Sequence, residues 1–347
     1  MSQLAIHGGT PVRDAEHPIA QPWPAYHAQD KARLEQVLES RAWGGYPEPS
    51  PLAKRFASSF AAHHDAGHGI MCTNGSVTLE VALMALGIEA GDEVIVPTYT
   101  WVATGACAVH MNAVPVFVDV EPETYCMDPE QVEAAITPRT RAIIPVHLGA
   151  SAADLDRLTA ICERHGLAMI EDCAHAHGGA WRGQGLGSWG AFGSFSFQVS
   201  KLMTSGEGGA LITKDDELAA RAHWVVNCGR KEPDFDHFPG RRFGINARIS
   251  EFQAAVLLGQ LEMLEEATAR RISAMNYLRQ GFEGIEGVTP LPVDPRLTTQ
   301  HAYQWILRYD AEGFAGVHRD VVLEALRAEG LSCDGPFYVP MHQHELF

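Results

Sequence analysis

The sequence carries few basic residues for its size. Lysine and arginine together number 26 of the 347 residues, against 43 aspartates and glutamates, and the formal net charge is −17 at pH 7. A protein that binds nucleic acid needs a basic face, because its cations replace the counterions around the phosphates. The charge balance therefore argues against nucleic acid as the main partner and is typical of a soluble protein.

Long apolar runs and paired cysteines are also missing. No run approaches the roughly 20 apolar residues that cross a bilayer, and the first residues lack the basic-then-apolar pattern of a signal peptide. We therefore expect no membrane contact. The seven cysteines form no C-x-x-C pair, which predicts reduced thiols in the cytoplasm. Histidines gather at 175–177 and 342–344 without a two-plus-two ligand spacing, so we predict no metal site.

What the sequence does contain is a regular alternation of apolar runs and helical patterns. Helical patterns separate most of the runs and lie at 76–88, 101–111, 128–136 and 153–166. The seven apolar runs lie at 69–72, 92–97, 113–120, 141–148, 167–172, 193–197 and 209–213. Strands that are apolar on both faces and alternate with helices predict a parallel sheet covered on both sides. We therefore predict an α/β protein with a seven-stranded, mostly parallel sheet flanked by helices.

The pattern changes near residue 250. A long helical pattern begins there, and its apolar stripe is formed by Phe252, Val256, Gly259 and Met263. Strand-like and helix-like segments follow to the end, which predicts a smaller α+β domain. We expect an N-terminal arm over 1–27, a large domain over 28–250 and a small domain over 251–347. The last residues do not read as a finished terminus, so we expect the small domain to be incomplete.

One lysine stands in an unusual place. Lys201 follows the apolar run that ends at 197 and precedes the glycines of 206–209, although lysines usually prefer water. Asp172 ends another predicted strand, and an acid at the carboxyl end of such a strand points into the ligand crevice. A lysine that forms a Schiff base and an acid that faces a ring nitrogen are two requirements of a pyridine-type cofactor.

A phosphate cradle completes the set. Residues 72–83 read as a strand, a tight Asn-Gly turn and a helix that opens at Ser76. This places the amides of Gly75 and Ser76 at a helix N-terminus, ready for an anion. The hydroxyl of Ser196, five residues before Lys201, is placed to join them. Together these features predict pyridoxal 5′-phosphate (PLP) as the cofactor.

Five segments carry a resemblance to a known family. They read PTYTWVATGACAV, VPVFVDVEPETYCMDPEQVEAAI, IEDCAHAHG, GSFSFQVSKLMTSGEGGALIT and GINARISEFQAAVLLGQL. In this order they resemble the DegT-type sugar aminotransferases, PLP enzymes of the aspartate aminotransferase fold, known as fold type I. The resemblance covers about residues 5–347. It implies that the large domain binds PLP and that the protein is an aminotransferase.

The resemblance also implies roles for single residues. Lys201 is the expected Schiff-base lysine and proton shuttle, and Asp172 is the expected partner of the pyridinium nitrogen. Trp101 is expected to stack on the ring, and His175 stands near the phenolic oxygen, where many relatives have Gln. Asn246 is expected to reach the phosphate of the neighbouring subunit's cofactor, which implies a homodimer with shared sites. The expected phosphate ligands within the chain are Gly75, Ser76 and Ser196.

The chain departs from many relatives on the expected substrate side. It reads HLGAS at 147–151, where many relatives read HLYGQ, and Gln198 replaces a frequent His. Both differences argue against a nucleotide-sugar preference. The segment SFQVSKLMTSGEGG around Lys201 is closer in form to the inosose aminotransferases and the aminohydroxybenzoate synthases. We therefore expect transfer of an amino group from glutamine or glutamate to a keto-sugar or a scyllo-inosose-like keto-cyclitol, in aminocyclitol, amino sugar or antibiotic biosynthesis.

Two other functions fit the same motifs. A PLP-dependent dehydratase or aromatase of the aminohydroxybenzoate synthase type keeps the cofactor and changes the reaction. A non-catalytic regulator of the same fold is the third hypothesis, against which the presence of Lys201 argues. Single residues also have plainer interpretations: Trp101 as core, Asp172 as a helix cap, Asn246 as a turn residue and 181–187 as a surface connection.

Overall fold

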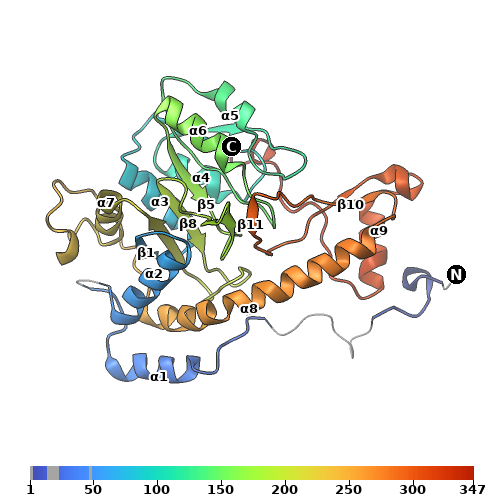
Figure 1. Ribbon diagram of the computed structural model, residues 1–347, viewed down its shortest axis with the longest axis horizontal. Coiled ribbons are helices and arrows are strands. Elements are labelled where there is room, and N and C mark those ends of the chain that lie inside the picture. The colour runs from blue at the N-terminus through green and yellow to red at the C-terminus, as the bar shows by residue number, and fades with distance from the viewer. Residues whose placement is uncertain (1–2, 14–22, 47–48) are drawn as a thin grey trace.

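A seven-stranded sheet forms the centre of the protein (Figure 1), whose computed structural model describes residues 3–13, 23–46 and 49–347. The strand order is β1-β9-β8-β5-β4-β2-β3. The bounds are β1 (His68–Cys72), β2 (Glu93–Pro97), β3 (Val114–Val118), β4 (Thr140–Ile143), β5 (Ala168–Asp172), β8 (Phe192–Ser196) and β9 (Gly209–Thr213). Strand β9 is antiparallel to both neighbours, and the other pairings are parallel. The predicted seven-stranded, mostly parallel sheet is confirmed.

Helices cover both faces of this sheet. Helices α3, α4 and α7 enclose one apolar core against it, and α2, α6 and α8 enclose another on the opposite face. Burial on both faces explains why the strands read as continuous apolar runs. The helix bounds are α1 (Asp30–Ser40), α2 (Pro51–His63), α3 (Gly75–Leu86), α4 (Ala103–His110), α5 (Pro129–Ala135), α6 (Leu155–His165), α7 (Asp216–Val226), α8 (Glu251–Phe282) and α9 (Arg319–Ala328).

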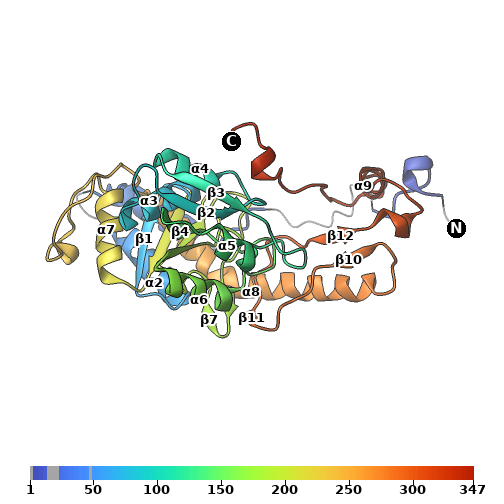
Figure 2. The same ribbon diagram turned by 90° about the horizontal axis from the view of Figure 1, so that it is seen from above.

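Helix α8 begins at a capping box, in which Ser250 and Gln253 satisfy each other's backbone amides. It then runs beneath the sheet to the C-terminal elements (Figures 1 and 2). The predicted stripe is wrong in part, because Phe252, Val256 and Met263 are only half-buried. The helix is enclosed by α1 and by α2, so its buried surface is wider and shifted. The buried residues include Ala254, Ala255, Leu257, Leu258, Gly259 and Leu264.

The C-terminal part follows α8. Strands β10 (Val288–Pro290) and β12 (Leu307–Tyr309) pair antiparallel, and β11 (Leu297–Thr299) pairs with the hairpin of β6 (Ala180–Trp181) and β7 (Gln184–Gly185). The interpretation of 181–187 as a surface connection is wrong. Trp181 and Leu186 are fully buried, because β11 lies along the hairpin and Arg296 stacks 4.5 Å from the centre of the Trp181 ring.

Both ends of the chain pack back on other elements. Within the predicted arm, the amides of Ala5 and Val12 donate to the carboxylate of Glu329 after α9, at 2.8 and 2.9 Å; residues 1–2 and 14–22 of that arm lie outside the described residues. At the other end, the Met341 amide donates to the Thr98 carbonyl at 2.7 Å. The short 3-10 helices are η1 (Ala5–His7), η2 (Pro233–Phe235), η3 (Ala311–Phe314) and η4 (Met341–Gln343). The division into domains at 28–250 and 251–347 stays a prediction.

The described part of the chain contains no helix that combines the length and the apolar character needed to cross a bilayer.

Candidate active site

Asp172 is the last residue of the central strand β5. Its carboxylate is buried, and it accepts hydrogen bonds from the Thr104 hydroxyl at 2.9 Å and from the Ala174 amide at 3.2 Å. Burial raises the pKa of Asp172, and both hydrogen bonds oppose that rise. Because its two donors are neutral, this carboxylate gains from a cationic partner.

Lys201 lies in the turn that follows β8, the neighbour of β5. Its side chain is mostly buried, and Nζ stands 4.6 Å from the centre of the Tyr303 ring. Burial lowers the pKa of Lys201 from 10.5 to about 8, and the negative charge of Asp172 offsets part of this change. The amine is therefore neutral in a usable fraction near neutral pH, as a lysine nucleophile requires.

Helix α3 begins against the end of β8. A Cβ atom at Gly75 would stand 2.6 Å from the Cβ of Ser196, so only glycine allows this approach. Asn74 caps the helix by accepting from the Val77 amide at 2.9 Å. The amides of Gly75 and Ser76 precede the first intrahelical donor and have no acceptor inside the helix. Two free amides beside the buried Ser196 hydroxyl make an anion site.

His175 is buried near Lys201. Its Nδ1 accepts from the Gly149 amide at 3.2 Å, so the proton of the neutral ring sits on Nε2, which lies 3.4 Å from the Tyr338 hydroxyl. Burial lowers the pKa of His175 well below 6.5. The ring stacks on Tyr303, with centres 4.1 Å apart and planes 25° from parallel.

Two predicted site residues lie at the surface. Trp101 is 59% exposed, which excludes the interpretation of this residue as core, and its ring centre is 6.2 Å from that of Tyr338. Asn246 is exposed in the bridge to Asn227. Among the described residues, no hydrogen bond joins the Asn246 side chain to another predicted site residue. The structure thus brings Asp172, His175 and Lys201 together and leaves Asn246 apart.

Comparison with known proteins decides the family. The model of the DegT/DnrJ/EryC1/StrS aminotransferase family matches residues 24–347. The chain belongs to this family. The predicted resemblance is therefore confirmed, and the protein is an aminotransferase.

Similar proteins narrow the branch of this aminotransferase family. A protein of Streptoalloteichus tenebrarius, provisionally named L-glutamine:3-amino-2,3-dideoxy-scyllo-inosose aminotransferase, is 51% identical over 100% of this chain and 83% of its own length. The L-glutamine:2-deoxy-scyllo-inosose aminotransferase of Micromonospora echinospora is 43% identical over 100% and 84%. The crystal structure of 3-amino-5-hydroxybenzoic acid synthase superposes with a TM-score of 0.86 at 36% identity, covering 94% of this chain and 84% of that one. The predicted fold type I is confirmed.

Sequence reasoning missed four residues that the aminotransferase places around the site. Thr104 binds Asp172, and Gly149, Tyr303 and Tyr338 surround His175. Both tyrosines come from the C-terminal quarter of the chain. The available signal was the aromatic residues of HAYQW and GPFYVP, and neither segment carries a spacing that points to a site.

A second buried cluster, formed by one histidine, one glutamate and one cysteine, lies next to Asp172 in the sequence and just after the end of β4. Ligand atoms of His147, Glu171 and Cys173 lie within 4.8 Å of one another. The Glu171 carboxylate faces the His147 ring at 3.2 Å and accepts from backbone amides at 2.7–2.9 Å. Those amides belong to Gly187, Trp189 and Gly190. Both oxygens are thus occupied, and the group anchors the loop before β8.

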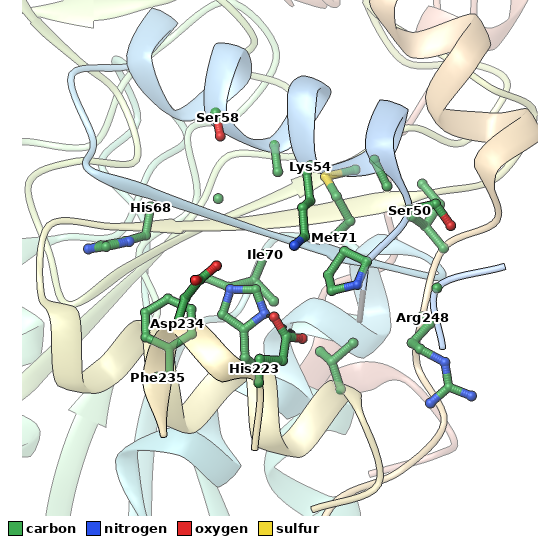
Figure 3. A pocket seen from close by; sticks show the side chains of 18 of the residues that line it. Ser50, Lys54, Ser58, His68, Ile70, Met71, His223, Asp234, Phe235 and Arg248 are labelled. Carbon is green, nitrogen blue, oxygen red and sulfur yellow. Dashed lines mark ion pairs between the residues drawn. The ribbon is translucent and has the colours of Figure 1, made fainter. Parts of the chain in front are cut away.

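A separate cavity of about 200 Å³ lies along β1, which is an edge strand of the central sheet. Lys54 of α2 and His223 of α7 reach into it (Figure 3). His223 pairs with Glu232, which also lines the cavity, at 3.2 Å. None of the predicted site residues lines this cavity, so the chemistry is assigned to the group around Lys201.

Proposed function

We propose that the protein is a PLP-dependent aminotransferase that moves the amino group of glutamine onto a keto-cyclitol. The observation that carries this proposal is the mostly buried Lys201, which lies near the buried carboxylate of Asp172 and whose pKa burial lowers to about 8. The similarity to the named inosose aminotransferases supports the substrate class.

The residues fit PLP at two points, the ring nitrogen and the phosphate. The carboxylate of Asp172 has neutral donors only, and the protonated ring nitrogen would supply the missing cationic partner. The amides of Gly75 and Ser76, with the Ser196 hydroxyl, would hold the phosphate. The close approach of Gly75 to Ser196 leaves space for nothing larger than hydrogen at that Cβ position. When bound, PLP supplies an electron sink for the carbon that gains or loses the amine.

The side chains of the protein then have separate tasks. The Lys201 amine would bind the cofactor until an amine substrate displaces it. The free amine would then accept a proton at Nζ from the substrate carbon that bears the amine and deliver it to the adjacent carbon of the cofactor. Asp172 would keep the ring nitrogen protonated. The Nε2–H of His175 would donate to the phenolic oxygen, and Trp101 would cover one face of the ring.

The preferred ketone of this proposal is 3-amino-2,3-dideoxy-scyllo-inosose. Proteins provisionally named for that substrate are 49–51% identical to this chain, whereas those named for 2-deoxy-scyllo-inosose are 41–43% identical. Each of these names gives glutamine as the donor, which supports glutamine over glutamate. Such a reaction belongs to aminocyclitol antibiotic biosynthesis. The cytoplasm is the proposed location, because all seven cysteines are unpaired.

We also propose a homodimer with shared sites. Phe243 is 96% exposed and Ile245 is 39% exposed, and both lie within the three residues that precede the exposed Asn246. Contiguous exposed apolar side chains mark surfaces that another protein covers, and a second copy of the same chain is the commonest such partner. In that dimer Asn246 would reach the phosphate bound by the partner.

The test is a visible spectrum of the purified protein with PLP, followed by addition of each donor and ketone. We expect a visible band that K201A lacks and that glutamine, but not glutamate, removes. Mass spectrometry should then find the aminated cyclitol. No band in the folded protein would overturn the proposal, and loss of water in place of amination would support the dehydratase that the 3-amino-5-hydroxybenzoic acid synthase structure suggests.

A further inference from the structure

Tyr303 contacts His175, Lys201 and Ser200 at the same time. Its ring stacks on His175 at 4.1 Å and lies 4.6 Å from Nζ of Lys201. Its hydroxyl lies 2.8 Å from Oγ of Ser200. Ser200 gives its own proton to Oε1 of Gln198 at 2.7 Å, so the Tyr303 hydroxyl donates to Ser200. The ring is therefore held by its face and by its tip.

The backbone holds the His175 ring at a second point, its Nδ1 atom. The Gly149 amide donates to Nδ1 at 3.2 Å, and Gly149 has a φ of +66°. A Cβ atom there would meet Cδ1 of Ile306 at 2.8 Å and the carbonyl oxygen of Gln304 at 3.2 Å. Only glycine combines this φ with this contact. The segment that carries Tyr303 thus rests directly on the residue that binds Nδ1.

We infer that Tyr303 is a positioning residue, which together with the Gly149 amide locks His175 as the Nε2–H tautomer. The amide makes Nδ1 an acceptor, and the stacked ring of Tyr303 prevents the imidazole from turning out of that hydrogen bond. Nε2–H then faces Tyr338, whose ring neighbours Trp101. A fixed donor on that side is what the second nitrogen of a histidine provides when the first is held.

The consequence for the cofactor rests on the proposed function. Nε2–H would donate to the phenolic oxygen of PLP without first having to change tautomer or rotate. Loss of that preorganised donor should weaken PLP binding about tenfold, the usual effect of one hydrogen bond to a charged group. The tautomer itself is a property of the protein without cofactor, so it is tested separately.

The experiment is ¹⁵N NMR of the protein labelled at histidine, without cofactor, at pH 7. The ring signals of His175 are identified by their loss in H175Q. We expect one unprotonated Nδ1 and one protonated Nε2 in the wild type, and exchange-averaged ring signals in Y303A. The matched control is Y309A, because Tyr309 lies in the same segment but binds Val317 and packs on Phe314. Y309A should leave the His175 signals unchanged.

Each outcome decides the inference. Averaged signals in Y303A, with about tenfold weaker PLP binding, support it. An unchanged single tautomer in Y303A overturns it, even if the wild type binds PLP. Y303L, which keeps apolar volume, replaces Y303A if the latter does not fold, with the same two readings. Failure of the wild type to bind PLP would instead overturn the proposed function and leave the NMR result to judge the tautomer alone.

Discussion

The reactivity of Lys201 should depend on pH in a way that no surface lysine imitates. With a pKa of about 8, about one tenth of the Lys201 side chains are neutral at pH 7. With the ordinary value of 10.5, about three in ten thousand would be neutral, a difference of about 300-fold. The cause is burial, because removal of water disfavours the ammonium form.

The assay is competitive labelling of the cofactor-free protein with a trace of acylating reagent between pH 6 and 11. The chain has only five lysines, so each labelled peptide is followed by mass spectrometry. Labelling of Lys201 should reach half its maximum near pH 8. The midpoint, unlike the absolute rate, does not depend on the intrinsic nucleophilicity of the amine. Lys214 is exposed after β9 and provides the reference profile.

A second variant tests the sign of the electrostatic effect. The negative charge of Asp172 favours the ammonium form and raises the pKa of Lys201. D172N removes that charge, so the Lys201 midpoint should move below 8 while Lys214 stays unchanged. A wild-type midpoint near 10.5 would refute the burial argument. A midpoint that rises in D172N would refute the assigned effect of Asp172.

Three further predictions follow from the contacts. D172N should keep PLP bound but lower kcat at least about 100-fold, because an amide does not hold the proton on the ring nitrogen; unchanged turnover would contradict its role. G75A should raise the dissociation constant of PLP at least about tenfold by displacing Ser196, whereas G281A, which meets no atom within 4 Å, should leave PLP binding unchanged. R296A should lower the free energy of unfolding by about 1 kcal/mol in urea titration, because Arg296 joins three carboxylates at a partly exposed site; R270A, at an exposed helix pair, should change it by less.

Periodicity and local chemistry were enough to predict the sheet. The strands of a parallel sheet that is covered on both sides must be apolar on both faces, so each strand appears in the sequence as a continuous apolar run. The ends of the strands then placed Asp172 and the turn before Lys201 on the same edge. Helix α8 was less well predicted, because the width of its buried face depends on α1 and α2, which are remote in sequence.

The sequence by itself therefore determined the strands, the lysine and the acid at their ends, and the Asn-Gly turn that opens helix α3, because each depends on neighbours within a few residues. Only the tertiary structure decided the surroundings of His175. Gly149 and Tyr303 are 154 residues apart, so no local pattern reports that both hold one imidazole. The lowered pKa of Lys201 is also a tertiary effect, since the burial that causes it is completed by Tyr303 from the C-terminal part of the chain.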